Sequence, residues 1–146
     1  MNANDTRAAL QRLRRYYEGL DPAALAQLDQ FYAADARFSD PFQSVQGLAA
    51  IRAVFEHMYR SLDGPRFIVH ELVADAGQGF MSWEFRFRLR PGAPELCVQG
   101  GTHFKFAADG RVTLHQDYWD AAGQLYVHLP LIGTLMRWLR RRMAGG

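Results

Sequence analysis

The segment Phe38-Ser39-Asp40-Pro41-Phe42 places one carboxylate between two large apolar side chains, immediately before a proline. Phe38 and Phe42 indicate that the segment is at least half buried. Pro41 favours extended backbone at Asp40 and prevents a helix from continuing into it. A carboxylate in such surroundings either finds hydrogen-bond partners or has its charged form disfavoured. Asp40 is therefore a candidate general base, and equally a candidate structural residue that caps the turn before the next helix.

The composition predicts one soluble globular domain spanning residues 1–146, with 49% hydrophobic and 22% charged residues and a net charge of +2. Two arginine clusters, near the start at residues 12–15 and at the end at residues 137–142, are not interleaved with aromatic residues on a strand surface, so we expect no nucleic-acid surface. Cys97 is the single cysteine and excludes an internal disulfide and a cysteine-based zinc site. The histidines show no metal-ligand spacing. The polar amino end and the absence of a long apolar run favour a cytoplasmic protein.

Helical spacing of apolar residues predicts three helices in the first part of the chain. The first covers residues 5–18, with Asp5 and Thr6 as its cap. The second starts at Asp21-Pro22 and carries an apolar face that reaches Tyr32. A short strand over residues 36–39 leads into Asp40, and the third helix runs from Gly47 to about residue 62.

Beyond residue 64 the hydrophobic period changes from helical to alternating, which predicts four strands over residues 66–74, 81–90, 95–106 and 111–119. The run from Met81 to Arg90 alternates apolar and polar residues without a break, as expected for an antiparallel strand with one buried face. Helices followed by strands indicate an α+β fold. A strongly curved sheet wrapped over the helices would enclose an apolar pocket with a few polar groups.

The hairpin at Asp109-Gly110 brings two titratable residues onto the inner face of this sheet. A two-residue turn pairs Phe106 with Thr113, then Phe104 with His115 and Thr102 with Asp117. A four-residue loop would shift the pairing by two and keep the same faces. His115, Asp117 and Trp119 are therefore predicted to share the face of Thr102 and Phe104.

This order of elements resembles the nuclear transport factor 2-like superfamily over roughly residues 5–120. The residues that carry the resemblance are Phe38-x-Asp40-Pro41 after two helices and the late strand Thr102-His103-Phe104-Lys105-Phe106. The similarity is greatest to the ketosteroid isomerase and SnoaL-like polyketide cyclase branches. It implies a cone-shaped, curved mixed or antiparallel sheet over three amino-terminal helices.

The resemblance also implies roles for individual residues. In the isomerases a tyrosine of the first helix donates a hydrogen bond to the substrate oxygen, and an Asp before Pro moves the proton; Tyr16 and Asp40 match these positions. The second acid of the isomerases is replaced here by Thr102, and Asp117, opposite Thr102, is a candidate displaced acid. His115 and Asp117 also resemble the late-strand acid–base residues of the cyclases.

We therefore predict a pocket enzyme that needs no metal or organic cofactor and moves a proton next to a carbonyl of a small hydrophobic substrate. The candidate catalytic residues are Asp40, Tyr16, Asp117 and His115. The alternative is a non-catalytic ligand-binding or protein-interaction domain in which Tyr16 is a core residue and His115 and Asp117 only fasten the sheet. The remaining candidate pocket residues are Thr102, Trp83, Phe85, Phe104, Trp119 and Phe42.

The carboxyl-terminal stretch departs from the isomerase pattern. Residues 130–143 are predicted to form an appended helix that combines apolar Leu135, Trp138 and Leu139 with an arginine cluster at residues 137–142. Three roles are compatible with this composition: a lid over the pocket, a contact with a partner subunit, and attachment to a membrane surface. Sheet-to-sheet dimers are common in the superfamily, so a homodimer is expected.

Overall fold

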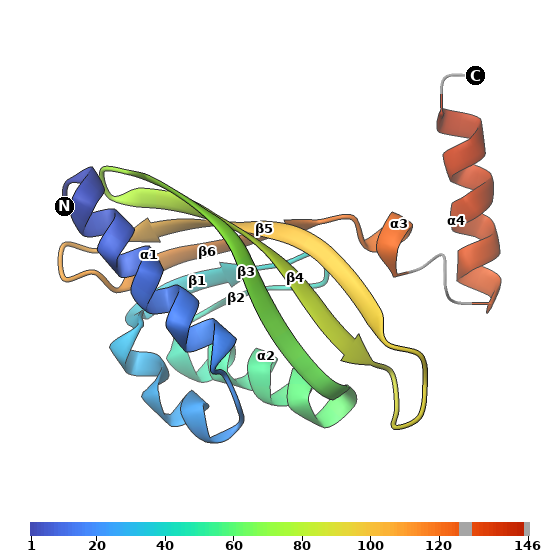
Figure 1. The fold of residues 1–146 in the computed structure, drawn as a ribbon, viewed down its shortest axis with the longest axis horizontal. Coiled ribbons are helices and arrows are strands. Elements are labelled where there is room, and N and C mark those ends of the chain that lie inside the picture. The colour runs from blue at the N-terminus through green and yellow to red at the C-terminus, as the bar shows by residue number, and fades with distance from the viewer. Residues whose placement is uncertain (126–129, 145–146) are drawn as a thin grey trace.

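A computed structural model describes residues 1–125 and 130–144 of the chain and contains a six-stranded sheet packed against helices (Figure 1). The helices precede most of the strands, as the change in hydrophobic period predicted, and the α+β class is confirmed. In chain order the elements are α1 (Ala3–Glu18), η1 (Ala23–Gln30), β1 (Tyr32–Ser39), β2 (Ser44–Gln46), α2 (Leu48–Ser61), β3 (Asp63–Asp75), β4 (Gln78–Arg88), β5 (Leu96–Phe106), β6 (Val112–Trp119), α3 (Ala121–Gln124) and α4 (Pro130–Met143).

The sheet is mixed and open, with the strand order β2-β1-β6-β5-β4-β3. β1 runs parallel to β6, and the other neighbouring pairs are antiparallel. α1 lies across β3 and β4, and α2 packs against β1 and β3 (Figure 1). The inner face of the sheet therefore meets the apolar stripes of these two helices.

Helix α1 begins earlier than the sequence pattern predicted. The side chain of Asn2 accepts a hydrogen bond from Asp5 N (2.9 Å), and the Asp5 carboxylate accepts one from Asn2 N (3.0 Å). This reciprocal pair is a capping box. Asp5 and Thr6 therefore lie inside the helix, where Thr6 is buried and its hydroxyl accepts a hydrogen bond from Gly77 N (2.9 Å).

The second predicted helix is a 3-10 helix that ends at Gln30, so Tyr32 belongs to a strand. Its first turn is capped by Asp21, whose carboxylate accepts a hydrogen bond from Ala24 N (2.7 Å). Strand pairing ends the helix, because Val112 N donates to Phe31 O (2.8 Å) and Tyr32 pairs with Val112. A non-local contact here overrides the helical spacing of apolar residues.

The register of the last hairpin places the predicted polar residues on one face. Thr102 pairs with Asp117 and Phe104 pairs with His115, as predicted. Phe106 pairs with Val112 rather than Thr113, because the register shifts between Lys105 and Phe106. The irregularity lies at the loop end of the hairpin, so the pairing closer to the centre of the sheet is unaffected.

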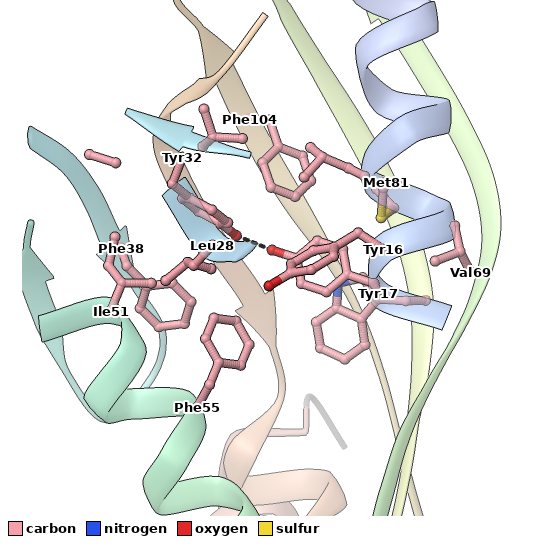
Figure 2. Packing of buried hydrophobic residues seen from close by; sticks show 14 of the residues in the cluster. Tyr16, Tyr17, Leu28, Tyr32, Phe38, Ile51, Phe55, Val69, Met81 and Phe104 are labelled. Atoms are coloured by element: carbon pink, nitrogen blue, oxygen red, sulfur yellow. Dashed lines mark hydrogen bonds between the residues drawn. The ribbon is translucent and has the colours of Figure 1, made fainter. Parts of the chain in front are cut away.

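Aromatic side chains dominate the core between the helices and the sheet (Figure 2). Tyr17 of α1 points towards Tyr32 of β1, and Phe55 of α2 approaches Phe38, with ring centroids 5.8 Å apart. Leu10 and Phe104 are completely buried. Burying such residues is the main favourable contribution to folding, at roughly 25 cal/mol per Å² of apolar surface.

Helix α4 has the predicted bounds and packs against the short helix α3, away from the sheet (Figure 1). Leu135, Trp138 and Met143 are exposed on it, and the Arg142 guanidinium lies 5.7 Å from the centroid of the Trp138 ring. Within residues 1–125 and 130–144, no helix is long and apolar enough to cross a membrane. The lid, dimer and membrane-surface roles of α4 stay predictions.

Candidate functional site

A cavity of about 320 Å³ lies between α2 and the inner face of the sheet. Its wall is mostly apolar, as predicted for a small-molecule site. Asp117 and Trp119 of β6 also border a second, shallower hollow on the surface, so both lie where the cavity approaches solvent. The lining residues that matter below are Tyr17, Phe42, Gln43, His57, Ser61, Trp83, Phe85, Thr102, His115, Asp117 and Trp119, together with Asp40 at the edge.

The polar part of the wall begins with a chain of hydrogen bonds from Trp83 to Asp117. Trp83 Nε1 donates to Thr102 Oγ1 (2.9 Å), and Thr102 Oγ1 lies 2.5 Å from Asp117 Oδ1. An indole nitrogen is only a donor, so the Thr102 oxygen accepts from Trp83 and its single proton must go to Asp117. Asp117 Oδ1 is therefore an acceptor, as in a carboxylate.

His115 approaches the same oxygen from the other side. His115 Nε2 lies 2.8 Å from Asp117 Oδ1, and an Nε2–H that donates to the carboxylate leaves Nδ1 as the acceptor. Tyr32 Oη lies 2.7 Å from Nδ1 and donates to it. Tyr17 Oη lies 3.1 Å from the same nitrogen and also hydrogen-bonds to Tyr32. We call these six residues (Trp83, Thr102, Asp117, His115, Tyr32 and Tyr17) the Asp117 network.

All hydrogen bonds of the Asp117 network therefore run in the same direction, from donor to acceptor, and end at Asp117 Oδ1. Burial is the main cause that raises the pKa of Tyr17 and of Tyr32 well above the ordinary tyrosine value. Both hydroxyls stay protonated and remain donors at neutral pH. Asp117 Oδ2 accepts no hydrogen bond within the described residues, and it is the oxygen left for a ligand.

Asp40 lies at the edge of the cavity, but its carboxylate is used by the turn between β1 and β2. Asp40 Oδ1 accepts hydrogen bonds from Phe42 N (2.8 Å) and Gln43 N (3.0 Å), and Oδ2 accepts one from Gln43 Nε2 (3.1 Å). These contacts are those of an Asx turn. Of the two roles open for Asp40, the structure supports the turn cap.

Tyr16 does not reach the cavity, which corrects the prediction of a pocket role. Its ring stacks on Phe31, with centroids 4.0 Å apart, and its hydroxyl donates to Ala24 O (2.8 Å). The neighbouring Tyr17 lines the cavity instead, because one residue turns a helix by about 100°. Tyr17 continues the apolar stripe of Leu10 and Leu13, and that stripe is the signal that distinguishes the two tyrosines.

The other predicted pocket residues divide into two groups. Phe104 is fully buried in the core and does not line the cavity, which corrects its predicted role. Tyr32 was missed because it lies in a segment read as helical. The predicted residues that do line the cavity are Thr102, His115, Asp117, Trp83, Phe85, Trp119 and Phe42.

In the part of the chain that the structure describes, no three or more His, Cys, Asp or Glu side chains form a group that could hold a metal ion. The chemistry available at the wall is instead that of one carboxylate, held on Oδ1 by two donors and open on Oδ2. Such a group accepts a proton or a hydrogen bond from a ligand.

Comparison with known proteins identifies what the chain is similar to. The family model described as SnoaL-like domain matches residues 13–115. No curated protein matches the chain by sequence.

Solved structures share the fold at low sequence identity. A protein from Jannaschia sp. CCS1, described as a SnoaL-like polyketide cyclase, has a TM-score of 0.70 and 13% identity, covering 83% of this chain and 89% of that one. A hypothetical protein with a ketosteroid isomerase-like fold from Catenulispora acidiphila DSM 44928, in complex with trimethylamine, has a TM-score of 0.68 and 15% identity, covering 80% and 88%. An LEH-like epoxide hydrolase from M. tuberculosis has a TM-score of 0.66 and 15% identity, covering 98% of both chains.

Proposed function

The chain belongs to the SnoaL-like domain family, and we propose that it is a small-molecule enzyme in which Asp117 is the general base. The substrate is a largely apolar molecule with a carbonyl group. Asp117 Oδ2 removes a proton from the carbon next to the carbonyl, and the electron pair of the broken C–H bond moves into an enolate. In an isomerase, Asp117 returns the proton to another carbon. In a cyclase, the enolate carbon bonds to a second carbonyl carbon, the π electrons of that carbonyl move to its oxygen, and this oxygen takes the proton from Asp117.

The observation that supports this proposal is that the two oxygens of Asp117 differ in their hydrogen bonding. Oδ1 accepts from Thr102 and His115, which hold the carboxylate in one orientation, and Oδ2 has no protein partner in the described residues. A positioned base of this kind contributes roughly 10²- to 10⁴-fold to a proton transfer. Similar structures named for a polyketide cyclase and an epoxide hydrolase support an enzyme of small molecules.

Asp40 and Tyr16 have no part in this mechanism. The hydrogen bonds to Asp40 fix the turn beside the cavity, and those of Tyr16 fasten α1 to η1. Thr102 supports Asp117 rather than the substrate oxygen, because its only proton goes to Asp117 Oδ1. His115 is a positioning residue that acts through Asp117.

The test incubates a panel of hydrophobic ketones with the protein in deuterated buffer. NMR then measures the rate of hydrogen–deuterium exchange at the carbons next to each carbonyl. Wild type should accelerate exchange of at least one ketone, and Asp117→Asn should reduce the enzymatic rate by roughly 10²- to 10⁴-fold. Asp40→Asn is the matched control, because it changes the same group at the edge of the cavity and should keep most of the rate. Equal losses in the two variants, or none in Asp117→Asn, would contradict the assignment of the base.

A second candidate function is ligand binding without catalysis. It is favoured by one observation: every donor of the Asp117 network ends on an acceptor inside the protein, as it would in a network that only fastens the sheet. A ligand that raises the melting temperature of the wild-type protein without any exchange of its protons would support this candidate.

A further inference from the structure

The proposed reaction needs a hydrogen-bond donor for the enolate oxygen, and most donors at the inner wall are already used. Tyr17 donates to Tyr32, Trp83 donates to Thr102, and His115 donates to Asp117. The Thr102 proton also goes to Asp117. Using any of these groups for a ligand would break a bond that holds the base in place.

The donors at the exposed mouth are partly engaged and lie on exposed side chains. Gln43 Nε2 donates to Asp40 Oδ2 (3.1 Å), and Ser61 Oγ and His57 Nε2 are hydrogen-bonded to each other (3.3 Å). Gln43, His57 and Ser61 are all exposed residues. In water an exposed hydrogen bond discriminates weakly, because solvent competes for both partners.

Trp119 is different from these residues. Its indole N–H donates to no acceptor in the described part of the chain, and it is not among the buried polar atoms that lack a partner. The residue is half-buried and lines the cavity. Its N–H is thus both unused and accessible.

The strand places this donor beside the base. Asp117 and Trp119 are two residues apart on β6, so their side chains leave the strand on the same face, from Cα atoms about 7 Å apart. An enolisable carbonyl group with one contact of about 3 Å at each end can span such a separation. Phe42 packs edge-on against the Trp119 ring, with centroids 5.4 Å apart, and helps to hold it.

Gly100 makes room for the indole. It pairs with Trp119 across β5 and β6, and a Cβ at this position would lie 2.7 Å from Trp83 Cη2 and 2.9 Å from Trp119 Cβ. The two tryptophan side chains therefore occupy the space that a side chain at position 100 would need. The absence of a side chain at Gly100 leaves space for the Trp83 indole and for the Cβ of Trp119.

We propose that Trp119 donates its indole hydrogen bond to the substrate carbonyl oxygen while Asp117 removes the neighbouring proton. As the C–H bond breaks, negative charge develops on that oxygen, and a donor already in place stabilises it more than it stabilises the neutral carbonyl. The proposal rests on the proposed function, since it assigns the second group of the same reaction. It also predicts selectivity for ligands with a carbonyl acceptor.

The experiment is a titration of ¹⁵N-labelled protein with 2-acetonaphthone, using 2-ethylnaphthalene as the matched hydrocarbon without the carbonyl. Three indole N–H resonances are expected, from Trp83, Trp119 and Trp138, and Trp119→Phe identifies the one that belongs to Trp119. We expect the Trp119 resonance to move downfield with the ketone and not with the hydrocarbon. Trp119→Phe should lower the affinity for ketone relative to hydrocarbon by roughly threefold to tenfold.

Two results would overturn the assignment: a Trp119 resonance that responds equally to both ligands, and a variant that keeps the wild-type preference for the ketone. Binding of neither ligand would contradict both the donor role and the proposed function. Asp117→Asn separates the two ideas. If it abolishes proton exchange and keeps the Trp119 shift, both stand; if wild type shows the shift without exchange, the donor role stands for binding and the catalytic function fails.

Discussion

Thr102 Oγ1 lies 2.5 Å from Asp117 Oδ1, and the two residues face each other in the register of β5 and β6. Thr102 occupies the position at which the isomerases carry a second acid, according to the resemblance. Its hydroxyl donates a hydrogen bond to the Asp117 carboxylate across this strand pair and orients it.

Thr102→Val tests this relationship, because valine keeps the shape of threonine and lacks its hydroxyl. Trp83 N–H would then be buried without an acceptor and Asp117 would lose one donor. We expect a loss of about 1–3 kcal/mol in the free energy of unfolding, measured by urea denaturation. Thr102→Ser keeps the hydroxyl and serves as the control. A valine variant as stable as the serine variant would contradict the network.

Tyr32 and Tyr17 should contribute unequally, although both lie near His115. Tyr32→Phe removes the donor 2.7 Å from His115 Nδ1, whereas Tyr17→Phe removes only the longer contact of 3.1 Å and leaves the shorter bond intact. We expect Tyr32→Phe to cost about 1–3 kcal/mol and Tyr17→Phe about 0.5–1.5 kcal/mol. Imidazole ¹⁵N shifts provide a second measurement, since Nε2 of His115 should carry the proton at neutral pH. A proton found on Nδ1 would reverse the direction assigned to the network.

Asp40→Asn should leave stability nearly unchanged, because an asparagine oxygen can still accept from Phe42 N and Gln43 N. Asp40→Ala removes these acceptors, and we expect it to cost about 1 kcal/mol, similar to the loss of a cap. Thermal and urea denaturation of the two variants measure the difference. If alanine is tolerated as well as asparagine, the turn does not depend on the Asp40 side chain.

Gly100→Ala should be more disruptive than Gly101→Ala. The added methyl at residue 100 meets Tyr118 O (2.8 Å), the Trp83 indole and Trp119 Cβ, whereas at residue 101 it meets the ring of the exposed Phe80, which can turn away. We expect a loss of about 1–3 kcal/mol for Gly100→Ala and less for Gly101→Ala. Tryptophan fluorescence should also change only in Gly100→Ala. Equal stability of the two variants would show that the indoles have room to move.

Stability should fall above about pH 10. Burial raises the pKa of Tyr16 and of Tyr59 to about 12, and raises those of Tyr17 and Tyr32 as well. Between the ordinary value near 10 and these raised values, the unfolded chain loses protons that the folded chain keeps. The folded state then binds more protons, so stability decreases as pH rises.

Urea midpoints at about pH 9 and about pH 11 measure this decrease, provided that both buffers have the same ionic strength. Tyr16→Phe removes one of the late-titrating groups and should make the decrease smaller. An unchanged difference between the two midpoints in this variant would mean that Tyr16 titrates alike in both states.

Local patterns predicted most of the elements, because period and turn chemistry act over a few residues. The alternation after residue 80 and the Asp109-Gly110 turn were enough to place Thr102 opposite Asp117 and Phe104 opposite His115. The predictions failed where the conformation of a residue depends on pairing with a strand that is distant in the sequence. Tyr32 leaves its helical pattern because β6 offers strand pairing, and Phe106 shifts register at a bulge.

The sequence by itself determined the fold class, the face shared by His115, Asp117 and Trp119, and the family resemblance, because these depend on periodicity and on short motifs. Only the tertiary structure decided which candidates act together. It turned Tyr17 rather than Tyr16 towards the cavity, used the Asp40 carboxylate in a turn, and left Asp117 Oδ2 and the Trp119 N–H without protein partners in the described residues. The physical reason is that a hydrogen bond depends on distances of a few ångströms between groups far apart in the chain, and these are set only when helices and sheet pack together.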